Sequence, residues 1–485
     1  MQNNNALKRY RFLNLEKALE ELMLFYEYLR QNPTVALRIA IYGSARFKAF
    51  DDPAADSNDP KVVFGMQMYE KAYKAALYLA KELGAIIITG GGPGIMEAGN
   101  RGGRAGGAES IALGIELPKE QKVNPFATQT FMFDYFFSRE MTFRYFSNAF
   151  IAAPGGYGTM AEFFERLILK DKEEKDTAPI ILLDREFYSF WLWYLERLRQ
   201  ESIAHHDQIP FIRKPIGKNF VLLNTPEQIL RYFKVMQKQI DAKAHLQYLL
   251  KKIKDSWAER AIGELYTAAV LINRTNIKRT ISIIGGQHIR KDAHSYNEAQ
   301  NLAFKLAQKG ISLLYRNNYT ISEAIAQGAR FADHSEAKLV AFNYYKDNEG
   351  CETDTDICCN FHDIFSQKIA LVEHTNYGIV YFPGGAGVLD LFYEVLTLIQ
   401  TKKIDPMPIV LIRNRYWDPI HDYHHKVLYE KAGTISEKDL YIYTIVDTGE
   451  EAFRIISNFA QQADTWGENT TAQEKWEAVQ RSYPV

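Results

Sequence analysis

The feature that most constrains the fold of this chain is a short motif that occurs twice. Residues Pro154–Glu165 read P-G-G-Y-G-T-M-A-E-F-F-E, and residues Pro383–Glu394 read P-G-G-A-G-V-L-D-L-F-Y-E. A motif repeated in this way indicates a duplicated structural unit, because both copies must satisfy the same local geometry. The copies share glycines and apolar positions but differ at polar positions. This pattern predicts that both halves have the same fold and that they differ in the residues able to carry out chemistry.

The segments around each motif repeat one order of strands and helices. Leu37–Arg46 and Thr280–His288 each predict a buried strand that ends in a glycine turn. Amphipathic helices follow at Tyr69–Gly84 and Tyr296–Gly310, where the last glycine supplies a left-handed cap. Strands that alternate with helices imply parallel sheets covered on both faces. The predicted fold class is α/β, with two tandem doubly wound (Rossmann-like) parallel-sheet domains plus N-terminal and linking helices.

The length of 485 residues exceeds the size that one hydrophobic core serves, so we expect several parts. They are an N-terminal helix over residues 1–36, a first domain over 37–240, a helical linker over 241–277, a second domain over 278–462 and a tail over 463–485. The tail is polar, which predicts that it is frayed.

Composition and charge give no sign that the chain binds nucleic acid or spans a membrane. A net charge of −1 gives no reason to expect binding to nucleic acid. The chain has no run of 18 apolar residues, so we expect no membrane span. The first residues lack the apolar core of a signal peptide, which predicts a cytoplasmic protein.

The cysteines and histidines give no metal-site pattern. Three cysteines at positions 351, 358 and 359 are too few for a disulfide framework and lack zinc-site spacing. His421, His424 and His425 have no accompanying glutamate of the H-E-x-x-H type, so they predict a histidine cluster on the surface of a helix.

Two glycine-rich loops of the first half follow predicted strands. They read T-G-G-G-P-G-I-M-E-A-G from Thr89 and P-G-G-Y-G-T from Pro154. In open α/β sheets, ligands bind at the carboxyl ends of strands, where glycine admits a close approach and a helix N-terminus attracts phosphate. We expect Thr159 to cap the helix after the second loop and to donate its hydroxyl to the phosphate. The expected phosphate- and substrate-binding residues are Ser44, Gly91, Gly92, Gly94, Met96, Glu97, Gly155, Gly156, Gly158 and Thr159.

Neither loop matches the two common nucleotide-binding motifs. A P-loop requires Gly-Lys-Ser/Thr after its glycines, and no lysine follows either loop. The dinucleotide fingerprint G-x-G-x-x-G has Glu97 at its third glycine position. A phosphate site of another kind is therefore expected.

Three charged side chains are candidates for chemistry on a bound ligand. Glu162 stands in the helix that the second loop opens, where a carboxylate suits stabilisation of an oxocarbenium-like ribosyl centre or positioning of a water. An acidic residue near a helix start is also favoured by the helix dipole alone. Upstream, Arg139 and Arg144 could each pair with phosphate or hold a leaving base, and spacing alone does not choose between them.

The first half resembles the LOG (Lonely Guy) family of nucleoside 5′-monophosphate phosphoribohydrolases, long described as lysine decarboxylases. The family signature P-G-G-x-G-T-x-x-E is matched in full from Pro154 to Glu162. Arg139 stands 15 residues before Pro154, the place of the family's catalytic arginine. The usual Arg-Lys pair reads Arg139-Glu140 here, and the resemblance covers roughly residues 35–235.

The resemblance implies hydrolysis of the N-glycosidic bond of a purine, AMP-like nucleoside 5′-monophosphate to free base and ribose 5-phosphate. The catalytic residues would be Arg139 and Glu162, and no metal or organic cofactor is implied. The partner is then a nucleoside monophosphate, and neither nucleic acid nor membrane is expected. The alternative is a non-catalytic nucleotide-binding sensor, because related folds also bind nucleotides without cleaving them.

The second half keeps the glycines of the signature and loses its polar residues. Val388 replaces Thr159, Leu391 replaces Glu162, and Gln367 in F-S-Q-K-I-A-L corresponds to Arg139. We expect this half to keep the fold without turnover. Members of the family work as dimers, so the second copy is expected to serve as an intrachain pseudo-dimer partner, or the chain to form a homo-oligomer. A regulatory nucleotide site at the remaining P-G-G-A-G turn is the other role left open.

Overall fold

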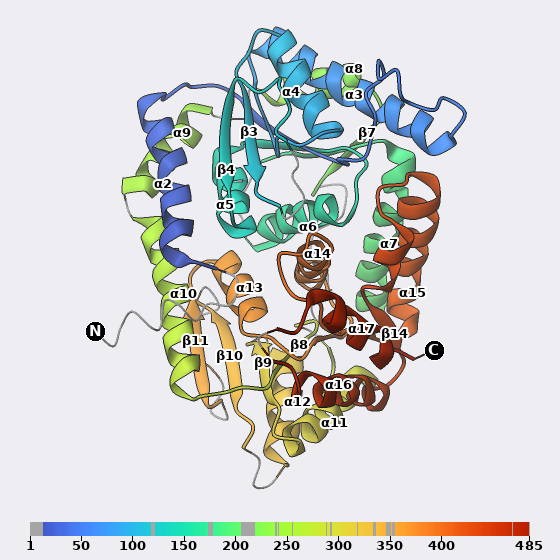
Figure 1. The fold of residues 1–485 in the computed structure, drawn as a ribbon. Coiled ribbons are helices and arrows are strands. Elements are labelled where there is room, and N and C mark those ends of the chain that lie inside the picture. Colours follow the sequence, from blue (N-terminus) through green and yellow to red (C-terminus); the bar gives the residue numbers. More distant parts are fainter. Residues whose placement is uncertain are drawn as a thin grey trace.

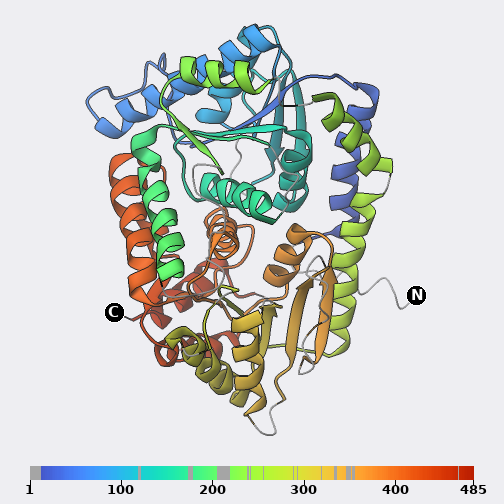
Figure 2. The same ribbon diagram turned by 180° about the vertical axis from the view of Figure 1, so that it is seen from behind.

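The computed structural model describes residues 13–484 except 118–121, 173–177, 205–218, 238–239, 241, 255, 288, 292, 318, 333–335, 346–350, 352–354 and 468. The strands form two seven-stranded parallel sheets, one in each half of the chain. Helices cover both faces of each sheet, as Figures 1 and 2 show from opposite sides. The predicted α/β class with two tandem doubly wound sheets is therefore confirmed.

The first sheet has the strand order β4-β3-β2-β1-β5-β6-β7. Its strands are β1 (Arg38–Tyr42), β2 (Ile86–Thr89), β3 (Ser110–Ile115), β4 (Gln129–Phe133), β5 (Ala149–Ala152), β6 (Ile180–Leu183) and β7 (Val221–Leu223). The helices of this half are α2 (Leu15–Gln31), α3 (Pro60–Leu83), α4 (Ile95–Ala105), α5 (Phe136–Phe146), α6 (Tyr157–Lys172), α7 (Arg185–Ala204) and α8 (Pro226–Met236). The central strands are apolar and buried throughout, as parallel strands between two helical layers must be.

The second sheet repeats this arrangement in the order β11-β10-β9-β8-β12-β13-β14. Its strands are β8 (Thr280–Ile284), β9 (Ser312–Arg316), β10 (Leu339–Tyr344), β11 (Ile357–Phe361), β12 (Ile379–Tyr381), β13 (Ile409–Ile412) and β14 (Thr444–Val446). Its helices are α11 (His294–Gln308), α12 (Tyr319–Arg330), α13 (Ile364–Glu373), α14 (Ala386–Gln400), α15 (Asn414–Tyr423), the π-helix η3 (His424–Lys431), the 3-10 helix η4 (Glu437–Tyr441), α16 (Gly449–Ala463) and α17 (Ala472–Ser482). Helices α9 (Ala242–Lys254) and α10 (Trp257–Arg274) connect the halves.

The order of strands places a switch point between β1 and β5, because the chain adds β2 to β4 on one side and then crosses over. The loops that follow β1 and β5 are joined there, since the Ser44 amide donates to the Pro154 carbonyl oxygen at 3.0 Å. A crevice at such a point, outside the carboxyl ends of the strands, is the usual ligand position in this type of sheet.

The two halves pack closely against each other. Helix α6 of the first half lies against α14 of the second, at the centre of both ribbon views (Figures 1 and 2), and the rings of Phe164 and Tyr393 stack with centroids 5.4 Å apart. Helices α7 and α15 also lie side by side, where the Tyr194 hydroxyl donates to the Tyr416 carbonyl oxygen at 2.6 Å. One continuous set of buried apolar side chains includes members from both halves, so this contact is part of the hydrophobic core.

The prediction of a frayed tail is wrong for residues 472–482, which form α17. Thr471 begins this helix with a capping box, in which its side chain accepts from the Glu474 amide and the Glu474 carboxylate accepts in return. Ala478 and Val479 of the helix are buried. Capping and apolar contact therefore outweigh the polar composition of the segment.

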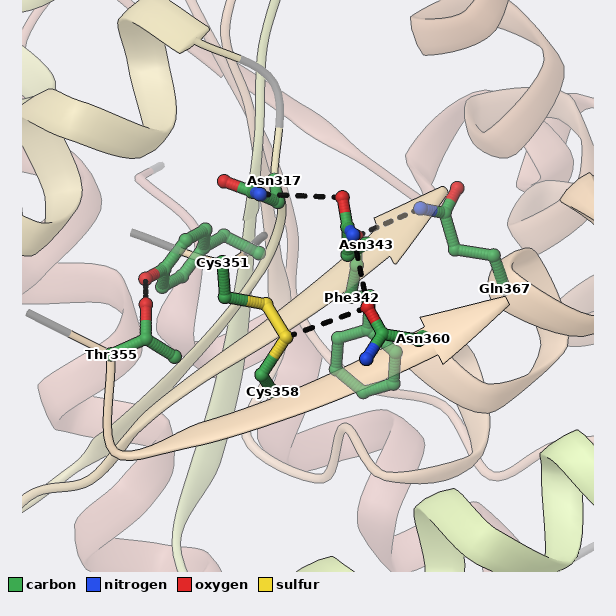
Figure 3. Close-up of a disulfide and its surroundings, with 9 residues drawn as sticks. Asn317, Phe342, Asn343, Cys351, Thr355, Cys358, Asn360 and Gln367 are labelled. Carbon is green, nitrogen blue, oxygen red and sulfur yellow. Dashed lines mark hydrogen bonds between the residues drawn. A yellow bond between two sulfur atoms is a disulfide. The ribbon is translucent and has the colours of Figure 1, made fainter. Parts of the chain in front are cut away.

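The cysteines and one histidine also differ from expectation. Cys351 and Cys358 form a disulfide that involves β11, of which Cys358 is a residue (Figure 3). Three cysteines were judged too few for a disulfide framework, and Cys359 is buried and free. His424 is fully buried rather than on a helix surface, with its Nε2 2.7 Å from the Tyr393 hydroxyl oxygen. Burial lowers the pKa of His424 well below its usual value, so the ring is neutral.

None of the described helices is both long and apolar enough to span a lipid bilayer.

Candidate active site

A cavity of about 560 Å³ lies at the switch point of the first sheet. Both glycine-rich loops contribute to its wall, together with the turn after β1. Of the residues expected at a substrate site, those that line the cavity are Ser44, Gly91, Gly92, Met96, Arg139, Gly156, Gly158, Thr159 and Glu162. The structure thus brings together segments that are more than 100 residues apart in the sequence.

Three of the expected binding residues do not line the cavity, and two of these, both glycines, shape its loops. Gly94 has φ of +68°, and a Cβ there would lie 2.3 Å from the Ser44 carbonyl oxygen, so only glycine fits. A Cβ on Gly155 would lie 2.1 Å from the Thr159 hydroxyl oxygen. The carboxylate of Glu97 accepts a hydrogen bond from the Tyr69 hydroxyl at 2.7 Å.

The N-terminus of α6 is part of the cavity wall. The helix begins at Tyr157, so Thr159 lies inside the first turn and does not cap the helix as predicted. The first-turn amides of an α-helix lack partners within the helix and carry a partial positive charge. Gly156, Gly158 and Thr159 therefore form a wall suited to an anion such as phosphate.

Arg139 and Glu162 face each other across the cavity wall. The Arg139 Nη2 lies 3.9 Å from the Glu162 Oε1, and their side chains are 10% and 16% exposed. The guanidinium of Arg139 also lies over the Phe136 ring, 4.7 Å from its centroid. Burial raises the pKa of Glu162 to about 8, and the nearby positive charge of Arg139 opposes this rise.

The structure separates the two candidate arginines. Arg144 is buried away from the cavity, where its Nη1 lies 3.1 Å from the Asp363 Oδ2 of the second half. Its guanidinium also lies over the Phe365 ring at 4.8 Å. Arg144 therefore joins the halves, whereas Arg139 is the arginine that a ligand could reach.

The second half supplies the rest of the cavity wall, which the sequence interpretation missed. Its contribution consists of the end of α14 and the segment around η4, through Thr397, Gln400, Thr401, Lys402, Thr434, Ser436, Lys438 and Asp439. No motif marks these residues, because they approach the cavity only through the packing of α14 on α6. The expectation of a partner copy beside the site was the one signal that pointed toward them.

The segment Thr434–Asp439 is fitted to the phosphate loop of the first half. A Cβ on Gly156 would lie 2.8 Å from the Thr434 carbonyl oxygen, so glycine permits this approach. The Tyr157 hydroxyl donates to the Asp439 carbonyl oxygen at 3.1 Å, and the Asp439 carboxylate lies 3.3 Å from the Arg46 Nη2. The first contact holds the phosphate loop against the second half, and the second contact holds the turn after β1 there.

The corresponding positions in the second half carry larger polar side chains. The strand registers align Gly90, Gly114 and Met132, which line the cavity, with Arg316, Asn343 and Asn360. Figure 3 shows the amides of this half joined together: Asn317 donates to Asn343 at 3.3 Å, and Asn343 donates to Asn360 at 2.9 Å. The Arg316 guanidinium donates to the Gly387 carbonyl oxygen at 2.9 Å, within the turn that corresponds to the phosphate loop.

No group of three or more His, Cys, Asp or Glu side chains among the described residues could hold a metal ion.

Fold and cavity define a class: an α/β protein with a candidate ligand site at the switch point of its first sheet. Residues 96–233 and 322–456 match the model of a family described as possible lysine decarboxylase, and together they span more than half of the chain. The chain belongs to this family, the LOG family.

Individual relatives match single parts of the chain. An uncharacterised protein of Archaeoglobus fulgidus is 33% identical over 115 residues, which are 24% of this chain and 71% of that protein. The molybdenum cofactor binding protein of Rippkaea orientalis is 20% identical with a TM-score of 0.27, over 41% of this chain and 97% of that one. The Moco carrier protein of Chlamydomonas reinhardtii is 18% identical with a TM-score of 0.28, over 42% of this chain and 99% of that one.

Proposed function

We propose that this protein is a nucleoside 5′-monophosphate phosphoribohydrolase, an AMP nucleosidase-like N-glycosidase that yields free base and ribose 5-phosphate. The observation that carries the proposal is the meeting of Arg139 and Glu162 in a cavity that also contains the N-terminus of α6. Membership of the LOG family supports a nucleotide-related role.

The geometry suggests how the reaction proceeds. The 5′-phosphate binds the first-turn amides of α6, which brings the ribose toward Glu162, further along the same helix. The N-glycosidic bond breaks with its electron pair on the departing base, and the carboxylate of Glu162 stabilises the positive charge that develops at C1′. A water then adds to C1′ and its proton passes to the departing base, while Arg139 donates hydrogen bonds to the phosphate or to the leaving base.

The second half is proposed to act as a built-in partner. Hydrogen-bonded polar side chains of the second half occupy the positions that correspond to cavity-lining residues of the first half, which favours this role over a regulatory nucleotide site. They are Arg316, Asn317, Asn343 and Asn360. The second half also completes the wall of the first-half cavity.

The proposed reaction is tested with AMP, GMP, CMP and UMP, by assaying ribose 5-phosphate and free base. We expect product from a purine monophosphate, and calorimetric titration of AMP into the Glu162→Gln variant is expected to fit one site per chain. Nucleotide binding without product from any of the four would instead support the sensor, and two sites per chain would support a regulatory second site.

The raised pKa of Glu162 gives the reaction a defined pH dependence. The role proposed for Glu162 needs its ionised form, so kcat/KM is expected to rise with pH through about 8 and to level off above it. The measurement is best made from pH 7 to 9.5, because a phosphate monoester is already mostly dianionic above pH 7. A decline of kcat/KM above pH 8 would show that the protonated acid is the active form and would contradict this role.

A further inference from the structure

Four cationic side chains line the cavity, and only two of them have a carboxylate beside them. Arg139 faces Glu162, and Arg46 faces Asp439. The other two cations, Lys402 and Lys438, both come from the second half and have no carboxylate within ion-pair distance among the described residues. A phosphate monoester carries nearly two negative charges at neutral pH. Both cations of the first half therefore have an acidic group beside them, whereas the two lysines add positive charge that no carboxylate among the described residues offsets.

Lys402 has a position that brings it close to the phosphate loop. It directly follows Thr401, the C-cap of α14, and the last turns of that helix lie against the loop. A Cβ on Gly158 would lie 3.6 Å from the Thr397 Cγ2, so the two elements are in contact at that point. Lys438 reaches the cavity from the other segment of the second half, within η4 and next to the Asp439 that faces Arg46.

The backbone of Lys402 supports a role for its side chain. Its φ is +61°, the left-handed region in which helices usually place glycine directly after the cap. A lysine there costs free energy relative to glycine, and the attraction of its charge to the C-terminus of the helix offsets only part of that cost. A function of the ammonium group in the cavity would account for a lysine at this position in spite of the free-energy cost.

We propose that Lys402 and Lys438 bind the 5′-phosphate of the nucleotide whose ribose faces Glu162. The degenerate half thus supplies the positive charge that a P-loop lysine supplies in other phosphate sites, and it makes the cavity selective for phosphorylated ligands over nucleosides. This inference depends on the proposed function for the identity of the nucleotide, and it concerns binding, which can be measured without turnover.

The test compares the full-length Lys402→Met, Lys438→Met and double variants, all in a Glu162→Gln background that slows turnover. Binding of AMP, ribose 5-phosphate and adenosine is measured by titration. The double variant is expected to lose about 10- to 100-fold in affinity for the two phosphorylated ligands, the range for hydrogen bonds to charged groups, and to keep its affinity for adenosine. Lys426→Met is the matched control, because Lys426 is an exposed lysine of the second half that pairs with Asp422 outside the cavity wall.

Two results would overturn the inference: an affinity for AMP and ribose 5-phosphate within twofold of the background protein, or an equal loss of affinity for adenosine. Failure of the proposed function has a different signature. If AMP binding depends on the lysines but the chain with Glu162 intact forms no ribose 5-phosphate, hydrolysis is contradicted and the phosphate site stands. Product formation together with AMP binding that does not depend on the lysines would support hydrolysis and contradict the lysine phosphate site.

Discussion

Replacing Glu162 with glutamine is expected to lower kcat for nucleotide hydrolysis by about 10²- to 10⁴-fold, the range for loss of a catalytic carboxylate. Glutamine keeps the size of the side chain and its place beside Arg139, but it has no charge to offer the ribosyl centre. Affinity for AMP is expected to change little, because the phosphate is bound elsewhere in the cavity. Ribose 5-phosphate release at saturating AMP gives kcat, and titration gives the affinity.

The same experiment contains its own controls. Glu82→Gln changes an exposed carboxylate that pairs with Lys234 outside the cavity wall, so kcat should stay close to that of the unsubstituted chain. Burial raises the pKa of Glu162 above its unfolded value, so ionising this group costs stability as pH rises from 4.5 through about 8. Glutamine removes that cost, and a drop in kcat with undiminished stability at pH 8 is a catalytic effect. Unchanged kcat in Glu162→Gln would refute the role of this residue.

Replacing Lys368 with methionine is expected to destabilise the folded chain by about 3–5 kcal/mol at pH 7, the range for removing one partner of a buried ion pair. The Lys368 side chain is 1% exposed, and its Nζ lies 3.3 Å from Asp390, 3.4 Å from Glu394 and 3.8 Å from Glu140. Without the ammonium group, three carboxylates are left together in the contact between the halves. Urea denaturation of the full chain measures the loss.

The loss is expected to shrink as pH falls. Burial raises the pKa values of Glu140 and Asp390 above their unfolded values, so protonation of these acids favours the folded state at low pH. Removing Lys368 raises both pKa values further, which confines most of the destabilisation to neutral and higher pH. Lys426→Met serves as the exposed control and should cost at most about 0.5 kcal/mol. Equal stability of Lys368→Met and the unsubstituted chain at pH 7 would contradict the importance of this cluster.

Much of the fold was predictable because the apolar strand sequences and the glycine helix caps agree with the burial and backbone conformation in the structure. Strands of the I-I-I-T kind can only be buried on both faces, and Gly84 does adopt the left-handed cap expected of it, with φ of +61°. Two available signals were missed. The Asp59-Pro60 start extends α3 well before Tyr69, and T-A-Q-E at Thr471 is a capping box that announces α17.

The candidate site was predictable only in its first half. Loops that end adjacent strands of one sheet must meet, so Arg139, Glu162 and the phosphate loop could be placed together from spacing and family resemblance. Lys402, Lys438 and Asp439 could not, because they reach the cavity through the docking of one half on the other. The burial of His424 depends in part on the same docking, because the Tyr157 ring of the first half lies against its ring with centroids 5.0 Å apart.

Glu140 and Lys368 occupy corresponding places, each following a Phe-Ser pair and a polar residue near the start of α5 or α13. Two copies of the first half joined in the same way would bring glutamate to glutamate with no ammonium between them, and two copies of the second half would oppose lysine to lysine. At this contact, the charge of each half is therefore complementary to that of the other half and not to that of a second copy of itself. Either half expressed alone would lack the opposite charge that its own buried side chain pairs with in the full chain.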